Sequence, residues 1–167
     1  MPIALYPGTF DPITNGHIDI AVRASCIFKK IVTVVADNPQ KNCLFTVEER
    51  MDMVQKSLKK IKNIEVVKYS GLIVDCIEKY KATAIIRGLR ALSDFDYEFQ
   101  MAFTNRELNS KADTVFLMPS AKYTYLSSTM IREIAQLGGE VRELLPDCVR
   151  KKLLEKFKTT KSKTKKK

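Results

Sequence analysis

Short β-branched segments alternate with longer amphipathic segments along most of this chain, and this alternation limits the possible folds more than any other feature. The strand candidates are apolar through their centres, as strands covered on both faces are: Ile3–Tyr6, Ile31–Ala36, Ile64–Lys68, Thr83–Arg87 and Thr114–Met118. Helical patterns lie at residues 17–29, 47–58, 72–80, 94–109, 127–137 and 147–157. The order predicts a single-domain α/β fold, a doubly wound parallel five-stranded sheet (Rossmann-like) with helices on both faces.

The positive charge of the chain is concentrated at its C-terminus. The last ten residues, Lys158–Lys167, hold six lysines and no acid, and without them the net charge falls from +10 to +4. We therefore predict one domain over residues 1–157 and a basic, disordered tail over 158–167. The mildly basic body suits an enzyme with anionic ligands and argues against a nucleic-acid partner.

Several classes of protein are disfavoured by what the sequence lacks. No apolar run reaches the roughly 18 residues of a membrane helix, and no secretory signal is visible, so we expect a cytoplasmic protein without a membrane partner. The four cysteines form no C-x-x-C pair and are expected to be small apolar side chains in a reducing compartment. Neither G-x-G-x-x-G nor a P-loop motif occurs.

In sheets of this kind, ligands bind beyond the carboxyl ends of the strands. The first predicted strand runs into the segment Tyr6–His17, which contains two glycines and leads into a helix that begins at about Gly16. A helix N-terminus offers free N–H groups to a phosphate, and His17, the only histidine, falls in its first turn. The alternative interpretation is an ordinary polar turn before a helix.

Three other strand ends carry groups that bind phosphate. The segment Arg87–Arg90 places two arginines around a glycine, and guanidinium groups suit phosphate oxygens, although ordinary surface charge is the alternative. The hydroxyls of Ser127–Thr129 begin a helix, where they either cap it or bind a phosphate. Lys41 follows the second strand and could equally be a solvated lysine. Together they predict a site for several phosphates, with one imidazole, no evident nucleophile and no protein metal site.

The segment Tyr6–His17 resembles the signature of the bacterial phosphopantetheine adenylyltransferase family, and its Thr14-x-Gly-His17 core resembles that of the wider nucleotidylyltransferase superfamily. Other segments match as well: Phe45–Arg50, Ile86–Arg90, Asp96–Glu98, Phe116–Ser120 and Ser127–Arg132. The resemblance covers roughly residues 2–157. Tyr123 stands where the family often has tryptophan, and the lysine tail is not part of the family pattern.

The resemblance implies an activity and partners. It implies that AMP passes from ATP to 4′-phosphopantetheine, with Mg²⁺, to give dephospho-coenzyme A and pyrophosphate in the penultimate step of coenzyme A biosynthesis. It also implies a homohexamer and inhibition by coenzyme A. Since a phosphate acceptor is already nucleophilic at neutral pH, positioning and charge stabilisation are sufficient for direct in-line attack.

The resemblance also assigns roles to individual positions. The catalytic residues it implies are His17, Lys41 and Arg90. The phosphopantetheine-binding residues are Thr9, Lys41, Ile73 and Arg87. The ATP-binding residues are Thr9, Phe10, His17, Gly88, Leu89, Arg90, Glu98, Tyr123, Thr124, Tyr125, Leu126, Ser127, Ser128 and Thr129.

Two alternatives remain at this point. One is another adenylyl- or cytidylyltransferase of the superfamily that acts on a different phosphorylated acceptor. The other is a nucleic-acid-binding module, which the isoelectric point of 9.5 suggests and the position of the charge in one tail disfavours.

Overall fold

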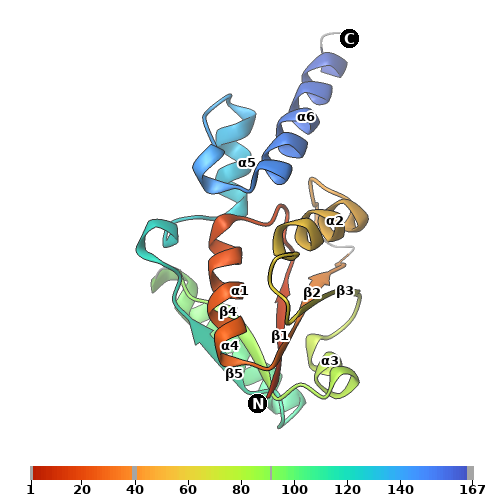
Figure 1. Cartoon of the computed structure of the whole chain (residues 1–167), viewed down its shortest axis with the longest axis vertical. Coiled ribbons are helices and arrows are strands. Elements are labelled where there is room, and N and C mark those ends of the chain that lie inside the picture. The colour runs from red at the N-terminus through yellow and green to blue at the C-terminus, as the bar shows by residue number, and fades with distance from the viewer. Residues whose placement is uncertain (1, 39–40, 91, 165–167) are drawn as a thin grey trace.

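A computed structural model gives the fold and describes residues 2–38, 41–90 and 92–164, without the side chains of 92–94 and 159–164. The described strands are β1 (Ile3–Gly8), β2 (Lys30–Ala36), β3 (Ile64–Tyr69), β4 (Ala84–Gly88) and β5 (Thr114–Leu117). They pair in parallel in the order β3-β2-β1-β4-β5 (Figure 1). The predicted five-stranded parallel sheet is confirmed, and each predicted strand overlaps an observed one.

The helices follow the predicted order with small shifts at their ends. They are α1 (Asn15–Ile27), α2 (Val47–Leu58), α3 (Ile73–Tyr80), α4 (Leu92–Leu108), α5 (Ser128–Gln136) and α6 (Asp147–Thr164). Two 3₁₀ turns, Ala121–Tyr123 and Arg142–Leu144, were not predicted. Both α1 and α2 begin with a capping box, with Thr14 and Thr46 as the N-caps. The second box has the usual glutamate, Glu49, at its third helical position, whereas the first uses His17 there, where glutamate or glutamine is usual.

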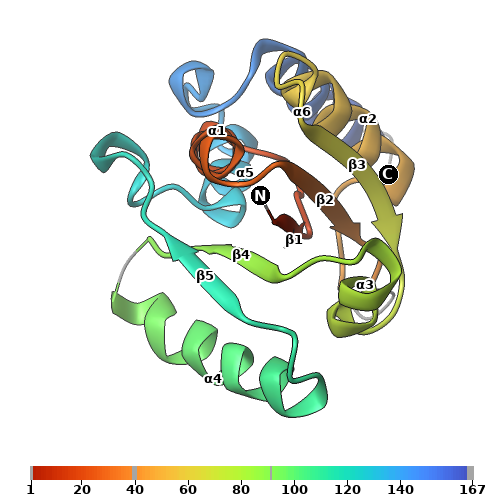
Figure 2. The same cartoon turned by 60° about the horizontal axis from the view of Figure 1, so that its bottom comes forward.

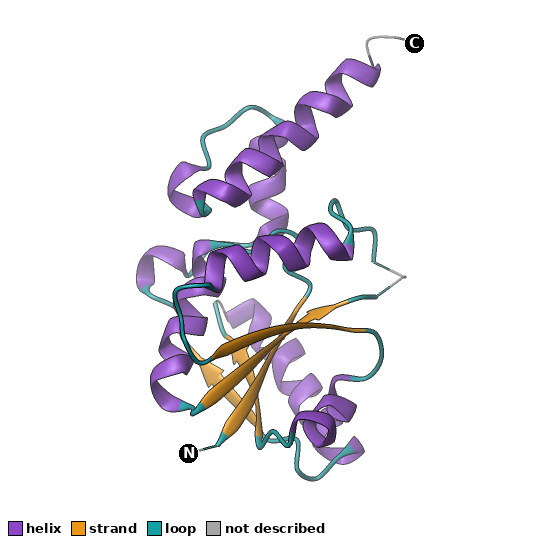
Figure 3. Cartoon of the chain, turned by 45° about the vertical axis from the view of Figure 1, so that its right-hand side comes forward, coloured by secondary structure: helices purple, strands orange, loops and turns teal. Residues whose placement is uncertain are grey.

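Side chains of the central strand β1 alternate between two apolar clusters. Ala4 and Tyr6 belong to the cluster that includes residues of α1, α2, α5 and α6, whereas Leu5 belongs to the cluster built with α3. This period of two is what a sheet covered on both faces requires. Figure 2 shows α3 and α4 on one side of the strands and the remaining helices on the other, and Figure 3 shows the same layers from the side. The prediction of helices on both faces is therefore confirmed.

Helix α4 departs from the expectation of a simple amphipathic helix packed on the sheet. Phe95, Phe99 and Phe103 recur at helical spacing, but their rings contact one another. The first pair is stacked with centroids 5.4 Å apart, and the second meets edge to face at 4.7 Å. They are 42%, 45% and 54% exposed. These three rings, here called the α4 ladder, are therefore half-exposed, and the helix that carries them runs beside the edge strand β5 (Figure 2).

Helix α6 is joined to α2 by ion pairs. Lys152 Nζ lies 2.5 Å from Asp52 Oδ2, and Lys156 Nζ lies 2.9 Å from Glu49 Oε2. The sequence placed the end of the domain at Phe157, whereas the helix continues to Thr164, and residues 165–167 lie outside the described part of the chain. No helix within the described residues combines the length and apolar character needed to cross a membrane.

Candidate active site

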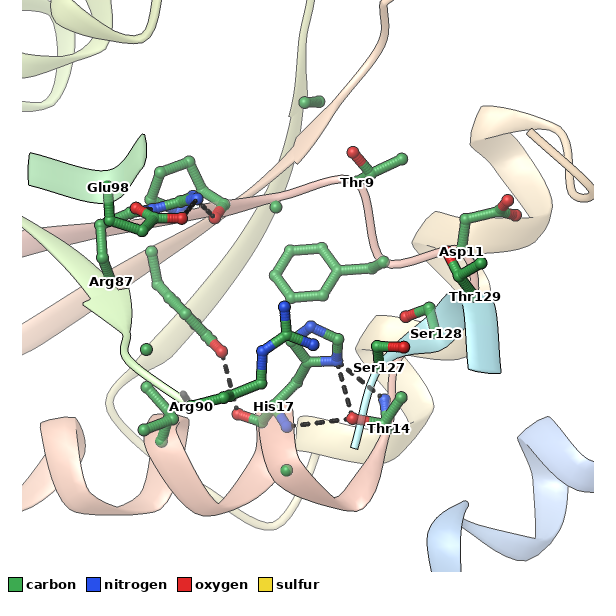
Figure 4. A pocket seen from close by; sticks show the side chains of 18 of the residues that line it. Thr9, Asp11, Thr14, His17, Arg87, Arg90, Glu98, Ser127, Ser128 and Thr129 are labelled. Carbon is green, nitrogen blue, oxygen red and sulfur yellow. Dashed lines mark hydrogen bonds and ion pairs between the residues drawn. The ribbon is translucent and has the colours of Figure 1, made fainter. Parts of the chain in front are cut away.

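The carboxyl ends of β1, β2 and β4 open into a cavity of about 660 Å³, which α4 and the start of α5 help to line. Figure 4 shows side chains from these separate elements directed toward one another. The cavity lies where the strand order reverses between β1 and β4, the usual ligand position in an open α/β sheet. The cavity therefore lies at the edge of the sheet where the sequence predicts that ligands bind.

The turn between β1 and α1 lines the cavity. Phe10 has a φ of 50°, a left-handed conformation that costs a non-glycine residue about 1–3 kcal/mol and that its surroundings must hold in place. Its ring is almost fully buried and meets the His17 ring edge to face, with centroids 5.2 Å apart. A Cβ atom on Gly8 would lie only 2.8 Å from the Phe10 ring, so glycine at this position leaves room for the ring.

His17 is oriented by its own helix cap. Its Nδ1 accepts a hydrogen bond from the backbone N–H of Thr14 at 3.0 Å, and the Thr14 hydroxyl accepts one from the His17 backbone N–H. Because a backbone N–H can only donate, the proton of the neutral ring is on Nε2. Burial, together with the nearby Arg90 and Arg87 charges, lowers the pKa of His17 to about 4. The cavity therefore contains a neutral imidazole with a fixed N–H donor.

Two arginines at the end of β4 are held in different ways. Arg87 donates from Nε and Nη2 to the two carboxylate oxygens of Glu98 on α4, at 2.6 and 2.5 Å, and from Nη1 to the Pro7 carbonyl. Three of its five N–H groups are thus used, and two remain for a ligand. Arg90 donates from Nη1 to the Leu126 carbonyl at 2.7 Å, so it links β4 to the segment that begins α5.

An exposed lysine, Lys41, lines the cavity from the segment that follows β2. Lys41 Nζ lies 3.4 Å from the hydroxyl of Thr9, which follows β1. Both residues line the cavity, as does Ile73 at the start of α3. The structure thus brings together a lysine and a hydroxyl that are 32 positions apart in the chain.

The three hydroxyls at the start of α5 have separate partners. Ser127 caps the helix by accepting from the Met130 backbone N–H at 3.1 Å, and Ser128 donates to the Pro12 carbonyl at 2.8 Å. Thr129 accepts from Arg132 Nη2 at 3.3 Å. Capping and phosphate binding were the two interpretations of this segment, and the structure assigns the cap to Ser127 while all three residues line the cavity.

Asp11 joins three segments around the cavity. Its carboxylate accepts from the backbone N–H groups of Leu44 and Phe45 at 2.8 and 3.0 Å. Arg132 Nη1 donates both to the Asp11 carbonyl and to its carboxylate. This buried aspartate therefore fixes the β1–α1 turn against the loop before α2 and against α5.

Comparison with known proteins agrees with this geometry. Residues 5–134 match the cytidylyltransferase-like family. The phosphopantetheine adenylyltransferase of Dictyoglomus turgidum is 53% identical over 155 residues, covering 93% of this chain and 97% of the relative. That of Caldanaerobacter subterraneus subsp. tengcongensis is 50% identical over 158 residues, covering 95% and 99%. The chain belongs to the phosphopantetheine adenylyltransferase family. The family prediction, and with it the nucleotidyltransferase class, is confirmed.

A solved structure supports the fold at lower sequence similarity. A Vibrio parahaemolyticus protein assigned as a nicotinate-nucleotide adenylyltransferase aligns with a TM-score of 0.67 at 18% identity, covering 93% of each chain. At this identity the likeness concerns only the fold. It agrees with the five-stranded parallel sheet of this chain.

Most residues that the family resemblance selected line the cavity. They are Thr9, Phe10, His17, Lys41, Ile73, Arg87, Gly88, Arg90, Glu98, Tyr123, Leu126, Ser127, Ser128 and Thr129. Leu89, Thr124 and Tyr125 do not line it, and the Tyr125 side chain is 83% exposed. Their predicted contacts with ATP remain predictions.

Sequence reasoning did not select the α4 wall of the cavity. Four lining residues come from this helix besides Glu98: Tyr97, Met101, Ala102 and Asn105. Their side chains share no chemical property that a sequence pattern could show, so only the position of α4 in the folded chain identifies them as lining residues. Arg132 and Asp11 were missed as well, although both lie inside quoted family motifs, because their mutual hydrogen bonds join positions 121 residues apart.

Proposed function

We propose that this chain transfers AMP from ATP to 4′-phosphopantetheine. An oxygen of the acceptor phosphate forms a bond to the α-phosphorus as the bond from that phosphorus to the bridging oxygen breaks, so dephospho-coenzyme A forms and pyrophosphate leaves. This is the penultimate step of coenzyme A biosynthesis. The observation that carries the proposal is the convergence of one neutral imidazole and four cationic side chains, those of Lys41, Arg87, Arg90 and Arg132, on a single cavity at the strand ends.

The acceptor side of the cavity is the proposed place for the phosphopantetheine phosphate. Lys41, Arg87 and the Thr9 hydroxyl together offer two positive charges and several donors. Ile73 supplies apolar surface next to them. The resemblance assigns Glu98 to ATP, but its carboxylate is bonded to Arg87, so we propose that it orients Arg87 for the acceptor.

The ATP side is proposed along the end of β4 and the segment before α5. Arg90 and the His17 Nε2–H would act on the α-phosphoryl group, while Gly88 permits close approach of the backbone. Leu89 and the segment Tyr123–Thr129 complete the proposed ATP contacts. A tyrosine ring at position 123 can stack on adenine as tryptophan does.

Mg²⁺ is the proposed metal of the reaction. The two carboxylates among the described lining residues, Asp11 and Glu98, are both bonded to arginines. Across the described part of the chain, no group of three histidine, cysteine, aspartate or glutamate side chains could hold a metal. Mg²⁺ favours phosphate oxygens and water, so the cavity suits an ion that binds with the triphosphate and neutralises part of its charge. The protein side chains then orient the two substrates.

Assembly and regulation follow from the same proposal. We propose a homohexamer, which the exposed apolar α4 ladder supports, because contiguous exposed aromatic surface is characteristic of subunit contacts. Coenzyme A carries the same pantetheine arm as the acceptor, so we propose that it inhibits by competing for this cavity. Sedimentation velocity and product-inhibition kinetics are the respective measurements.

Location and domain boundaries are proposals too. The four cysteines are free, which suits the proposed cytoplasmic location. We retain residues 1–157 as the catalytic domain and 158–167 as the basic tail. The predictions that neither nucleic acid nor membrane is a partner remain predictions.

Removing residues 158–167 is expected to leave kcat/KM within about twofold, because surface segments away from a site contribute little. The truncated chain keeps Lys156, which anchors α6 to Glu49. Steady-state kinetics of the truncated and full chains measures the effect. A tenfold loss would show that the tail belongs to the active site or to the assembly.

The direct test of the proposed function is pyrophosphate release from ATP with Mg²⁺ and 4′-phosphopantetheine. A panel that exchanges ATP for CTP, and the acceptor for other phosphorylated compounds such as nicotinate mononucleotide, distinguishes this activity from other reactions of the superfamily. Turnover restricted to ATP and phosphopantetheine is expected. Faster turnover with another pair would replace the proposal.

No covalent nucleotidyl-enzyme is expected during the reaction. Among the described lining residues, the Thr14 hydroxyl is the one bonded to the imidazole, and Thr14 is 1% exposed and occupied as a helix cap. Incubation with α-labelled ATP alone, followed by denaturation, should therefore leave the protein unlabelled. Stoichiometric AMP on the denatured chain would contradict direct transfer.

A further inference from the structure

Arg50 is a buried cation beneath the cavity that the proposed reaction does not use. It projects from α2 and is 3% exposed. Its Nη1 donates at 2.7 Å to two backbone carbonyls, those of Thr9 and Ala36. The Nη2 atom lies 3.9 Å from the half-exposed Asp37 carboxylate, and Nε has no hydrogen-bond partner among the described residues.

The first of these carbonyls belongs to the turn that shapes the site. Thr9 directly precedes Phe10, whose left-handed conformation places its ring against His17. Thr9 lines the cavity, and its hydroxyl lies 3.4 Å from Lys41 Nζ. A hydrogen bond to the Thr9 carbonyl therefore acts on the peptide between the proposed acceptor-binding hydroxyl and the residue that packs on the imidazole.

The second carbonyl ends β2. Ala36 lines the cavity and is the last residue of the strand before the segment that carries Lys41. A single Nη1 atom thus links the carboxyl ends of β1 and β2. Thr9 directly follows the first of these strands, and Lys41 lies in the segment that follows the second. If this link is lost, these two side chains can move relative to each other even though the strands still pair.

The charge of Arg50 is also incompletely compensated by the protein. A buried guanidinium group normally has a close carboxylate, whereas here the carbonyl partners are neutral and the carboxylate contact is long. Arginine at this position therefore adds positive potential beneath Thr9 and Ala36, which favours an anion in the cavity above them.

We propose that Arg50 is a positioning residue, which sets the Thr9–Phe10 turn and the end of β2 so that Thr9 and Lys41 receive the acceptor phosphate and Phe10 holds His17. This rests on the proposed function for the identity of the acceptor. The Arg50 side chain does not line the cavity, so its action on the substrates passes through Thr9, Phe10 and Ala36.

The test compares Arg50→Met with Arg150→Met in the full chain. Arg150 is a matched control, because it also has a buried Nε without a partner but lies on α6 and does not line the cavity. Arg50→Met should raise the KM for phosphopantetheine and lower kcat, reducing kcat/KM by about tenfold, since small displacements of positioned groups have effects of this size. The Kd for ATP should change less than threefold, and Arg50→Lys should be intermediate in KM.

A second readout does not depend on turnover. His17 is the only histidine, so its imidazole gives a single set of NMR resonances. These resonances should shift in Arg50→Met, because the Phe10 ring moves, and should stay in place in Arg150→Met. If wild-type protein lacks turnover but the resonances shift as expected, the proposed function fails and the positioning role survives. A folded Arg50→Met variant with wild-type kinetics and unshifted resonances would overturn the inference, as would an ATP Kd that rises as much as the acceptor KM.

Discussion

Replacing Arg87 with alanine is expected to weaken phosphopantetheine binding by about 1.5–3 kcal/mol, or roughly 10- to 150-fold in Kd, the range for a lost charge-assisted contact. Arg87 still has two N–H groups after its bonds to Glu98 and Pro7, and like Lys41 it lines the cavity. ATP affinity should change much less. Calorimetric titration with each substrate in turn measures both values.

Part of this loss of affinity is expected to come from the partner of Arg87. In Arg87→Ala the carboxylate of Glu98, whose side chain is 11% exposed, is left without its cation and repels the incoming phosphate. The double variant Arg87→Ala/Glu98→Gln removes that repulsion and should recover part of the acceptor affinity. Arg106→Ala, which breaks an exposed ion pair with Asp113, is the matched control and should change neither affinity. A larger loss of ATP than of acceptor affinity would contradict the assignment.

The sequence was sufficient for the sheet because strand position is a local property here. Ile31–Ala36 is apolar except for Thr33, as a strand buried on both faces is nearly throughout, and the structure buries Ile31 to Val35 completely. Once the strands are placed, parallel pairing brings their carboxyl ends to one edge. Residues as distant as Thr9 and Lys41 could therefore be predicted to meet.

The pairings inside the site could not be predicted in the same way. Asp11 and Arg132 lie in two separate motifs, and each motif has other charged or hydroxyl side chains that could have been the partner. Glu98 illustrates the same limit, since its position within a family motif suggested ATP while its carboxylate is bonded to Arg87. Which donor meets which acceptor depends on how helices dock, and helical spacing does not contain that information.

The α4 ladder shows a different limit. Phe95, Phe99 and Phe103 repeat with the period of a helix that packs on a core, yet they are exposed. Periodicity identifies an apolar face but not the surface that covers it, which can be the sheet of the same chain or another subunit. The face of α4 that lines the cavity carries a mixture of side chains instead, Tyr97, Glu98, Met101, Ala102 and Asn105.

The largest effect on turnover is expected at His17. His17→Ala should lower kcat by on the order of 10²–10³, or about 2.7–4 kcal/mol, as the loss of one preorganised donor to a developing charge does. The structure gives the donor a fixed direction, because the Thr14 N–H occupies Nδ1 and leaves the proton on Nε2. ATP affinity should fall far less, since the donor acts mainly on the transition state.

The pH dependence follows from the lowered pKa of His17. At a pKa of about 4 the folded, ligand-free protein keeps the ring neutral, so kcat/KM, which reports the free enzyme, should show no His17 inflection between about pH 5 and 8. The unfolded chain titrates this group near 6.5, so unfolding takes up a proton between about pH 4 and 6.5. The free energy of unfolding should therefore decrease as the pH falls from about 6.5 to about 4. In His17→Ala this contribution to the pH dependence should be absent.

His17→Gln separates the capping role from the chemical one. Glutamine at this helix position can accept from the Thr14 N–H through its carbonyl oxygen and can still direct an amide N–H into the cavity. It should therefore keep the thermal stability that His17→Ala loses, and its kcat should lie between those of the alanine variant and the wild type. Equal kcat losses for both variants, with stability retained in glutamine, would show that only the imidazole has the required geometry. A His17→Ala variant that no longer binds ATP but turns over bound ATP normally would contradict the transition-state role, because the imidazole would then act on ground-state binding alone.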